Sequence, residues 1–243
     1  MSEVFSKHGV KVKEVIPMSS IRRVIAERMT TSLREMAQVT LMREEVVEAL
    51  VKVREELKDK IEKEVGVRLT YTPIFIKVAA EALKNHPIVN SVLEDDQIKI
   101  LDEINIGFAV ATERGLIVPV VKNVDKKDFK TIVYEVNSLI TKTREGRLTF
   151  QDIEGGTFTI TNLGMYGIDG FTPIINPPQV AILGIGRIIN KPVVVENRIE
   201  IKPTCVFSLT HDHRVIDGHV GAQFLDTFIK ILTNEQELKR ILS

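Results

Sequence analysis

Two neighbouring segments of the chain are apolar at almost every position, and they constrain the fold more than any other feature. Residues 104–111 read INIGFAVA and residues 116–121 read LIVPVV, and the turn-forming run 112–115 separates them. A strand with one face in water alternates apolar and polar side chains, whereas a strand covered on both faces does not. We therefore expect this pair of strands in the middle of a sheet, with Pro119 at a bulge or an edge.

The remaining segments mix helical and strand patterns without a regular βαβ order. Apolar residues at helical spacing predict helices over residues 21–33, 50–65, 74–83, 129–144 and 220–232. β-Leaning runs predict strands over residues 39–46, 89–93, 98–101, 155–164, 180–185, 193–195, 198–201 and 204–209. This order predicts the α+β class, with a mixed β-sheet that contains antiparallel hairpins and is sandwiched by helices.

Several helix ends carry recognisable local signals. Ser19 or Ser20 can cap the first helix, and Gly66 is placed to end the second. Thr72, followed by Pro73, is expected to open the third helix, which is apolar nearly all round and should therefore be buried.

Composition narrows the function and the compartment. The 243 residues include 33 basic and 33 acidic ones, so the formal net charge is zero and neither nucleic acid nor a membrane surface is an expected partner. One large domain is expected over residues 17–243, after an extended arm or linker remnant at 1–16. The lone Cys205 can form no internal disulfide, which favours a reducing, cytoplasmic location.

Residues 210–218, THDHRVIDG, gather two of the five histidines and two aspartates between a strand pattern and a helix pattern. A histidine with an aspartate four residues on suits a general base with an orienting carboxylate. His213 could instead be a packed turn histidine, and Asp217 could cap the last helix. A metal site at His211 and His213 is disfavoured because no further ligand cluster is present. His86, which precedes a proline at a helix end, is a weaker candidate.

Two other features bear on a site. Residues 165–178 form a long irregular loop rich in glycine and proline, and such loops are usually functional. Arg22, Arg23 and Arg28 lie opposite the apolar stripe of the first helix. They are either a solvated face, or one of them turns inward to pair with a carboxylate.

Five colinear segments resemble one family, the acyltransferase core of dihydrolipoamide acyltransferases, which are the central component of 2-oxo acid dehydrogenase complexes. The segments are 20–29 (SIRRVIAERM), 106–121, 156–164 (GTFTITNLG), 177–186 and 212–218 (DHRVIDG). The last is also similar, in shorter form, to a motif of chloramphenicol acetyltransferase. The resemblance covers roughly residues 16–243 and implies a chloramphenicol acetyltransferase-like fold.

The resemblance also implies a reaction and its residues. The family transfers an acyl group between S-acyl-dihydrolipoamide and coenzyme A, which are its substrates, without a metal. Its catalytic histidine falls on His213 and not on His211, and its motif aspartate falls on Asp217. Thr161 stands where the family often has a serine, and it is the expected oxyanion donor. No covalent acyl-enzyme is needed, so Cys205 should be dispensable.

The partners implied by the resemblance are copies of the chain and other components of the complex. The family forms a homotrimer in which His213 of one chain would meet Thr161 of its neighbour, and trimers assemble into a large cage. Lipoyl domains, the decarboxylase and dihydrolipoamide dehydrogenase are the other expected partners. The family's usual lipoyl and subunit-binding domains are not recognised here, which suggests a truncated core.

Two alternatives remain open at the level of the sequence. One is a stand-alone coenzyme A-dependent acetyltransferase that acts on a small hydroxyl acceptor. The other is a non-catalytic cage scaffold, although the presence of both His213 and Asp217 argues against it. The acyl group, whether acetyl, succinyl or branched-chain, and the residues that bind coenzyme A are not evident.

Overall fold

The computed structural model describes residues 4–112 and 115–243 of the protein. Its fold is built on one large mixed sheet. The strands run in the order β1-β11-β9-β8-β4-β7, and β10 pairs with the far part of β11. Their bounds are β1 Gln38–Val46, β4 Ile106–Phe108, β7 Val120–Val121, β8 Phe158–Asn162, β9 Ala181–Ile185, β10 Ile189–Val195 and β11 Arg198–Asp212. β8 is parallel to both of its neighbours, and the other pairs are antiparallel. The predicted mixed sheet is confirmed.

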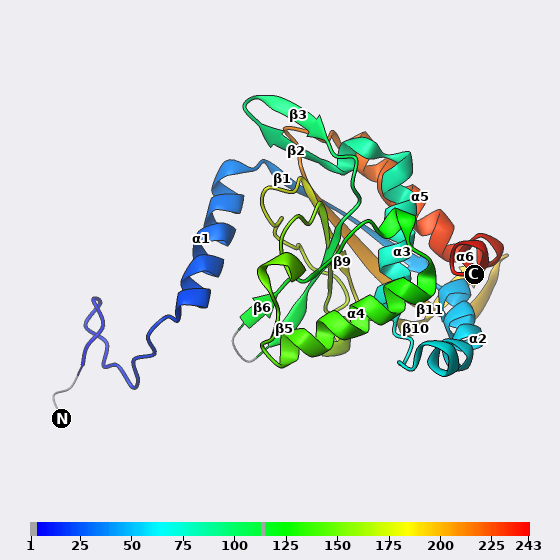
Figure 1. Cartoon of the computed structure of the whole chain (residues 1–243), viewed down its shortest axis with the longest axis horizontal. Helices are drawn as coiled ribbons and strands as arrows, with labels where there is room; N and C mark the ends of the chain where they lie inside the picture. The colour runs from blue at the N-terminus through cyan, green and yellow to red at the C-terminus, as the bar shows by residue number, and fades with distance from the viewer. Residues whose placement is uncertain (1–3, 113–114) are drawn as a thin grey trace.

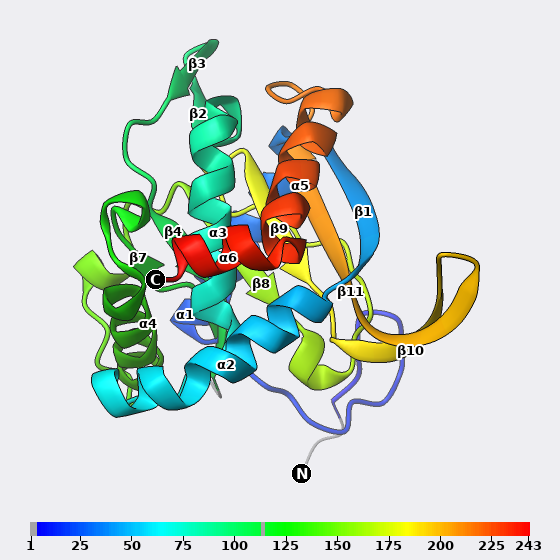
Figure 2. The ribbon, with the colours of Figure 1, turned by 90° about the vertical axis from the view of Figure 1, so that its right-hand side faces the viewer.

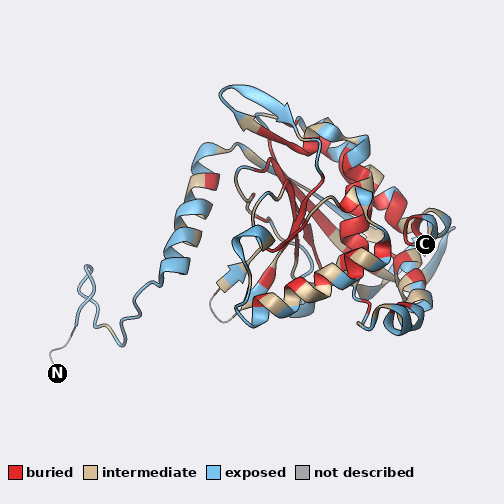
Figure 3. Ribbon diagram, in the orientation of Figure 1, coloured by how far each residue is buried: buried red, intermediate tan, exposed pale blue. Residues whose placement is uncertain are grey.

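Helices cover one face of this sheet, with α3 and α5 lying directly against it (Figure 2). The bounds are α2 Glu48–Val65, α3 Tyr71–Asn85, α4 Phe129–Arg144, α5 Gly218–Thr233 and α6 Glu235–Ile241. Phe158 of the sheet packs against Phe224 of α5, with ring centroids 5.6 Å apart, and Phe207 packs against Phe228 at 5.5 Å. The buried residues in Figure 3 are concentrated between these layers. Burial of such large side chains is the main driving force for this packing.

The opposite face of the sheet is covered by the irregular loop between β8 and β9. A Cβ added at Gly184 in β9 would lie 3.0 Å from the ring of Phe171, and one at Gly170 would lie 3.0 Å from Val206 of β11. The loop therefore packs closely against the sheet and does not hang free in solvent.

Most predicted helix signals are confirmed. The side chain of Ser19 accepts a hydrogen bond from the backbone of Arg22 at the start of α1 (Ser20–Glu35), and Gly66 ends α2 with a left-handed backbone. The expected cap at Thr72 is wrong, because α3 already begins at Tyr71 with Thr70 as its N-cap residue. As predicted, α3 is largely buried.

The apolar hairpin is only partly central. β4 lies inside the sheet between β8 and β7, whereas β7 is its edge strand. The distal parts, β5 (Val110–Thr112) and β6 (Gly115–Ile117), form a separate two-stranded sheet. The break falls at Ala109 and Pro119, so Pro119 does mark a bend beside an edge strand. The central residues of the predicted turn, 113–114, lie outside the described residues.

Two further differences concern pairing. The strands expected at 198–201 and 204–209 are one strand, β11, because β10 pairs with its first half and β1 with its second half. The β2–β3 hairpin (Ser91–Glu94 and Gln97–Ile100) forms as expected, with Asp95 and Asp96 at positive φ in the turn.

The first described residues extend away from the body and lead into α1, which stands off the main sheet (Figure 1). Val24 and Leu33 of α1 are more than half exposed, so part of the apolar stripe of this helix is not covered within the chain. Among the described residues, no helix combines the length and the apolar character that crossing a bilayer requires.

Candidate active site

The turn between β11 and α5 presents His213 and Asp217 to solvent. β11 ends at Asp212, and α5 begins at Gly218 with Asp217 as its N-cap residue. The Nδ1 atom of His213 lies 4.0 Å from Oδ1 of Asp217, and 46% of the His213 side chain is exposed. The backbone N–H of His213 donates to the carbonyl of Ala37, at 2.8 Å. The backbone of His213 is thus held in place, while its imidazole ring remains accessible to solvent.

Asp212 holds this turn in place. Its carboxylate is fully buried and accepts hydrogen bonds from Nη2 of Arg214, at 2.6 Å, and from the backbone N–H groups of Ala37 and Arg214. This pairing raises the pKa of Arg214, chiefly through the hydrogen bond from its side chain to Asp212. A buried carboxylate needs such partners to offset its lost hydration.

The sequence allowed an arginine of the first helix to turn inward and pair with a carboxylate. Among the described residues, Asp217 forms its ion pair with His213, whereas Arg214 forms an ion pair with Asp212. Arg28 does turn inward from α1, but Nη2 donates to the carbonyl of Pro177, at 2.6 Å, and not to a carboxylate. The inward-turned arginine therefore fixes a loop rather than an acid.

His211 is a different kind of residue from His213. It is fully buried, its ring centroid lies 6.0 Å from that of His213, and neither ring nitrogen has a hydrogen-bond partner among the described residues. Burial, and then the nearby His213, lower the pKa of His211. A Cβ at Gly221 would lie 3.1 Å from this ring, so the glycine lets α5 approach it. His211 is a neutral packing residue.

Thr161 lies on β8, far from His213 of the same chain. It pairs with Gly184 of β9, which pairs with Ser208 of β11. His213 is five residues beyond Ser208 and lies just past the end of β11. With about 3.4 Å per residue along a strand and about 4.8 Å between strands, the two groups are roughly 20 Å apart. One chain does not bring its own Thr161 and His213 together.

Other candidates are structural. Burial raises the pKa of Cys205 to about 12, so its thiol is unreactive. His86 ends α3 and forms a 2.7 Å hydrogen bond with Thr227, and burial lowers its pKa. Within the described ranges, no three His, Cys, Asp or Glu side chains are grouped so as to hold a metal ion.

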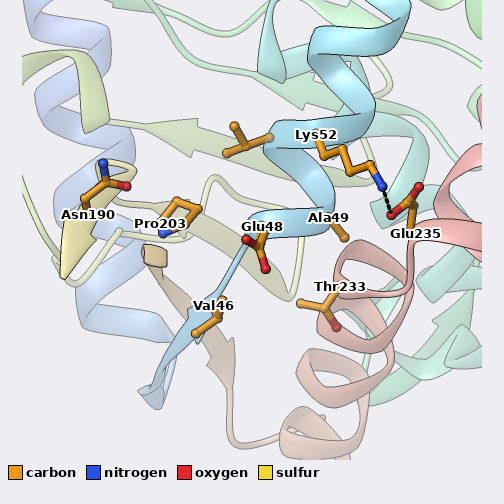
Figure 4. Close-up of a pocket in the computed structure, with 9 residues that line it drawn as sticks. Val46, Glu48, Ala49, Lys52, Asn190, Pro203, Thr233 and Glu235 are labelled. Carbon is orange, nitrogen blue, oxygen red and sulfur yellow. Dashed lines mark hydrogen bonds and ion pairs between the residues drawn. The ribbon is translucent and has the colours of Figure 1, made fainter. Parts of the chain in front are cut away.

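Two cavities of the described structure lie away from His213. One of about 790 Å³ is bordered by α2, α6 and the ends of β1 and β10, and Figure 4 shows the Lys52–Glu235 ion pair at its wall, at 2.8 Å. This is the Val46 end of β1, whereas His213 follows the opposite end, where Gln38 pairs with Asp212. A second cavity, of about 330 Å³, borders Asn162, next to Thr161.

A model of the family described as 2-oxoacid dehydrogenases acyltransferase (catalytic domain) matches residues 10–239. The chain belongs to this family. The succinyltransferase component of the 2-oxoglutarate dehydrogenase complex of Rickettsia typhi is 38% identical over 223 residues, which are 92% of this chain and 56% of that protein. The acetyltransferase component of the pyruvate dehydrogenase complex of Bacillus subtilis is 43% identical over 223 residues, 91% of this chain and 50% of that protein. The chain thus spans about half the length of the curated relatives it matches.

Solved structures of family members have the same fold. The dihydrolipoamide acetyltransferase of Azotobacter vinelandii matches with a TM-score of 0.91 and 32% identity, covering 98% of each chain. The cubic core of the pyruvate dehydrogenase multienzyme complex gives the same values. Chloramphenicol acetyltransferase matches with a TM-score of 0.52 and 16% identity over 93% of this chain and 100% of that one, which shows a shared fold alone. The predicted family and the chloramphenicol acetyltransferase-like α+β fold are confirmed.

Proposed function

We propose that this chain transfers an acyl group between S-acyl-dihydrolipoamide and coenzyme A, at a site formed where two copies of the chain meet. The observation that carries the proposal is the placement of the site residues. His213 is exposed beside Asp217 at a chain surface, while Thr161 lies roughly 20 Å away by strand register. A site that uses both groups needs His213 from one chain and Thr161 from another.

The assignment of these three residues is supported by the spacing of three residues studied in a relative. The Azotobacter vinelandii structure was determined to study the roles of a serine, a histidine and an asparagine in its catalytic mechanism. In that protein the serine precedes the histidine by 52 positions, and the asparagine follows the histidine by four. Thr161, His213 and Asp217 have the same spacing here. Thr161 keeps a hydroxyl at the position of the serine, and Asp217 has a carboxylate where that protein has the asparagine amide.

The chemistry follows from these groups. In the direction of coenzyme A acylation, the neutral ring of His213 takes the proton of the coenzyme A thiol as its sulfur attacks the thioester carbonyl. The resulting imidazolium is stabilised by the carboxylate of Asp217, 4.0 Å from Nδ1. Thr161 of the neighbouring chain donates its hydroxyl to the tetrahedral oxyanion. Collapse of the intermediate expels the dihydrolipoamide sulfur, which receives the proton from the imidazolium.

The proposal extends to partners and compartment. Relatives are named as components of 2-oxoglutarate and pyruvate dehydrogenase complexes, and one structural neighbour is a multimeric cubic core. We therefore propose a homotrimer that assembles into a cage and works with lipoyl domains, a decarboxylase and dihydrolipoamide dehydrogenase. We also propose a cytoplasmic location, which the lone free thiol of Cys205 favours. The relatives include both succinyl and acetyl transferases, so the acyl group is best assigned by comparing acetyl-, succinyl- and branched-chain acyl-coenzyme A in one assay.

Replacement of His213 by alanine tests the catalytic claim. The variant should lose about 100- to 10,000-fold in kcat for acyl transfer from acyl-coenzyme A to dihydrolipoamide, because the thiol then lacks its general base. The measurement is the steady-state rate of wild type and variant, with circular dichroism to show that both are folded. Equal and measurable rates would contradict the role of His213 as general base, and no transfer by either protein would leave only the scaffold interpretation. Preferential transfer to small hydroxyl acceptors would favour the stand-alone acetyltransferase.

A further inference from the structure

Gln179 links β8 to the segment that enters β9. Its side chain is buried; Oε1 accepts a hydrogen bond from the hydroxyl of Thr159, at 2.6 Å, and Nε2 donates to the carbonyl of Gly156, at 3.0 Å. Thr159 and Thr161 are two residues apart on β8, so both side chains lie on the same face of the strand. Gln179 thus holds Thr159, which lies on the same face of β8 as the proposed oxyanion donor Thr161 and two residues before it.

The same segment also holds the histidine turn. The carbonyl of Val180, the residue after Gln179, accepts a hydrogen bond from the backbone N–H of Asp212, at 2.9 Å. Asp212 in turn accepts from Ala37, whose carbonyl binds the backbone of His213. Three hydrogen bonds, through Asp212 and Ala37, therefore connect the Gln179 segment to the backbone of His213.

Contacts from α1 and β1 close this network. Gln38, next to Ala37, accepts from the backbone of Ile175 through Oε1, at 3.2 Å, and donates to Ser32 through Nε2, at 2.8 Å. The buried hydroxyl of Ser32 donates to the carbonyl of Ile175, at 2.7 Å. Residues 175–180 therefore contact the residues that hold His213, through Ile175 and Val180, and also β8, through Gln179. A shift of this segment would move both.

We propose that Gln179 is a positioning residue that sets the place of both the Thr161 hydroxyl and the His213 ring of its own chain. The inference rests on the proposed function, in which these two groups serve different active sites. Each chain then ties two neighbouring sites together through its Gln179 segment. Gln179 touches no reacting atom in this account; it acts through β8 and through the histidine turn.

Replacement of Gln179 by methionine, which has similar length and no hydrogen-bonding amide, tests the proposal in the assembled protein. Loss of alignment should lower kcat by about 10- to 100-fold and leave KM within about twofold. Thr159→Val should produce most of the same defect, and the double variant should be little worse than Gln179→Met alone, because Gln179→Met already removes the hydrogen bond to Thr159. Gln179→Glu keeps an acceptor for Thr159 and should retain more activity than Gln179→Met.

Thr143→Val is the matched control. Thr143 is also a buried threonine, and its hydroxyl donates to the carbonyl of Leu139 on α4, at 2.6 Å. This variant should lose some stability and keep its kcat. Wild-type kcat in Gln179→Met would overturn the proposal, and so would an equal loss in Thr143→Val.

Assemblies of two chain types assign the effect to each group. A His213→Ala chain and a Thr161→Val chain, expressed together, form active sites from the Thr161 of the first and the His213 of the second. Gln179→Met placed on the first chain tests the threonine, and placed on the second it tests the histidine. The proposal predicts a loss of at least about fivefold in both arrangements, within the range that misalignment produces. A loss in only one arrangement would overturn the tie between sites. Failure of the parent pair to gain activity would instead contradict the two-chain site.

Discussion

His211 and His213 differ sharply in environment, although one residue separates them. His211 is still within β11 and is enclosed by α5, whereas His213 lies just past the strand end and keeps nearly half of its side chain exposed. Only the second can meet a substrate thiol. The composition of the motif by itself does not show which histidine is the base. The two are distinguished by where β11 ends, because His211 lies inside the strand and His213 lies beyond it.

The buried His211 should make stability depend on pH. Burial lowers its pKa in the folded chain, so the unfolded chain binds a proton first as the pH falls below about 6.5. The stability associated with the neutral ring is therefore present above that pH and is lost below it. We expect the free energy of unfolding in urea to fall between about pH 7.5 and about pH 5.5, and to fall less in His211→Phe. An identical fall in both proteins would contradict this assignment.

Thr161 should act through its hydroxyl. Thr161→Val removes the hydroxyl at nearly constant volume and should lower kcat by about 100- to 1,000-fold, the usual effect of losing one oxyanion donor. Thr161→Ser keeps the hydroxyl and should remain within about tenfold of wild type. Steady-state kinetics with both substrates distinguish the two. Equal losses in the valine and serine variants would show that packing, and not oxyanion stabilisation, is the role of this residue.

Cys205 should be dispensable for turnover. Its thiol is buried, with a pKa raised to about 12, so almost no thiolate exists at neutral pH. Cys205→Ala is expected to keep its kcat within about twofold and to lose about 1 kcal/mol of stability from the small cavity. The assay is acyl transfer, alongside thermal unfolding. Loss of turnover in a folded variant would point to a covalent acyl-enzyme and against direct transfer.

At the scale of elements, local chemistry predicted most helices and the strands with clear patterns. Ser19 and Gly66 terminate helices as expected because capping depends on a few neighbouring residues. The hairpin at 104–121 was predicted less well. After β4 it bends, and β5–β6 leaves the main sheet, because membership of a sheet depends on distant partners such as β8. The short helix α6 was not anticipated.

The candidate site shows the same division. Its reactive residues stand in motifs that can be read from the sequence, but the contacts that hold them cannot be read from it. Asp212 binds the backbone of Ala37, 175 positions away, and Gln179 holds Thr159 from another segment. Neither contact produces a periodic pattern in the sequence from which it could be predicted. The position of Asp212 at the start of the DHRVIDG motif was the available sign for that residue, and no sequence feature singled out Gln179.

At the scale of the whole molecule, apolar surface remains exposed in several places. Val194, Ile199 and Ile201 on the β10–β11 hairpin are each at least 75% exposed, and Val24 and Leu33 on α1 are more than half exposed. Cross-strand pairing places Val194 beside Ile199, so the hairpin residues form one surface. Monomeric proteins seldom leave such surfaces in water, which supports the proposed assembly of several copies.

The two-chain site is tested most directly by mixing two inactive variants. His213→Ala and Thr161→Val chains, each assembled alone, lack one group at every site. Co-expressed in equal amounts as trimers, they should place an intact His213 opposite an intact Thr161 at about a quarter of the sites. We therefore expect acyl transfer to recover to about a quarter of the wild-type rate in mixed assemblies. Activity no greater than the sum of the two separate variants, in assemblies shown by affinity tags to contain both chains, would contradict it.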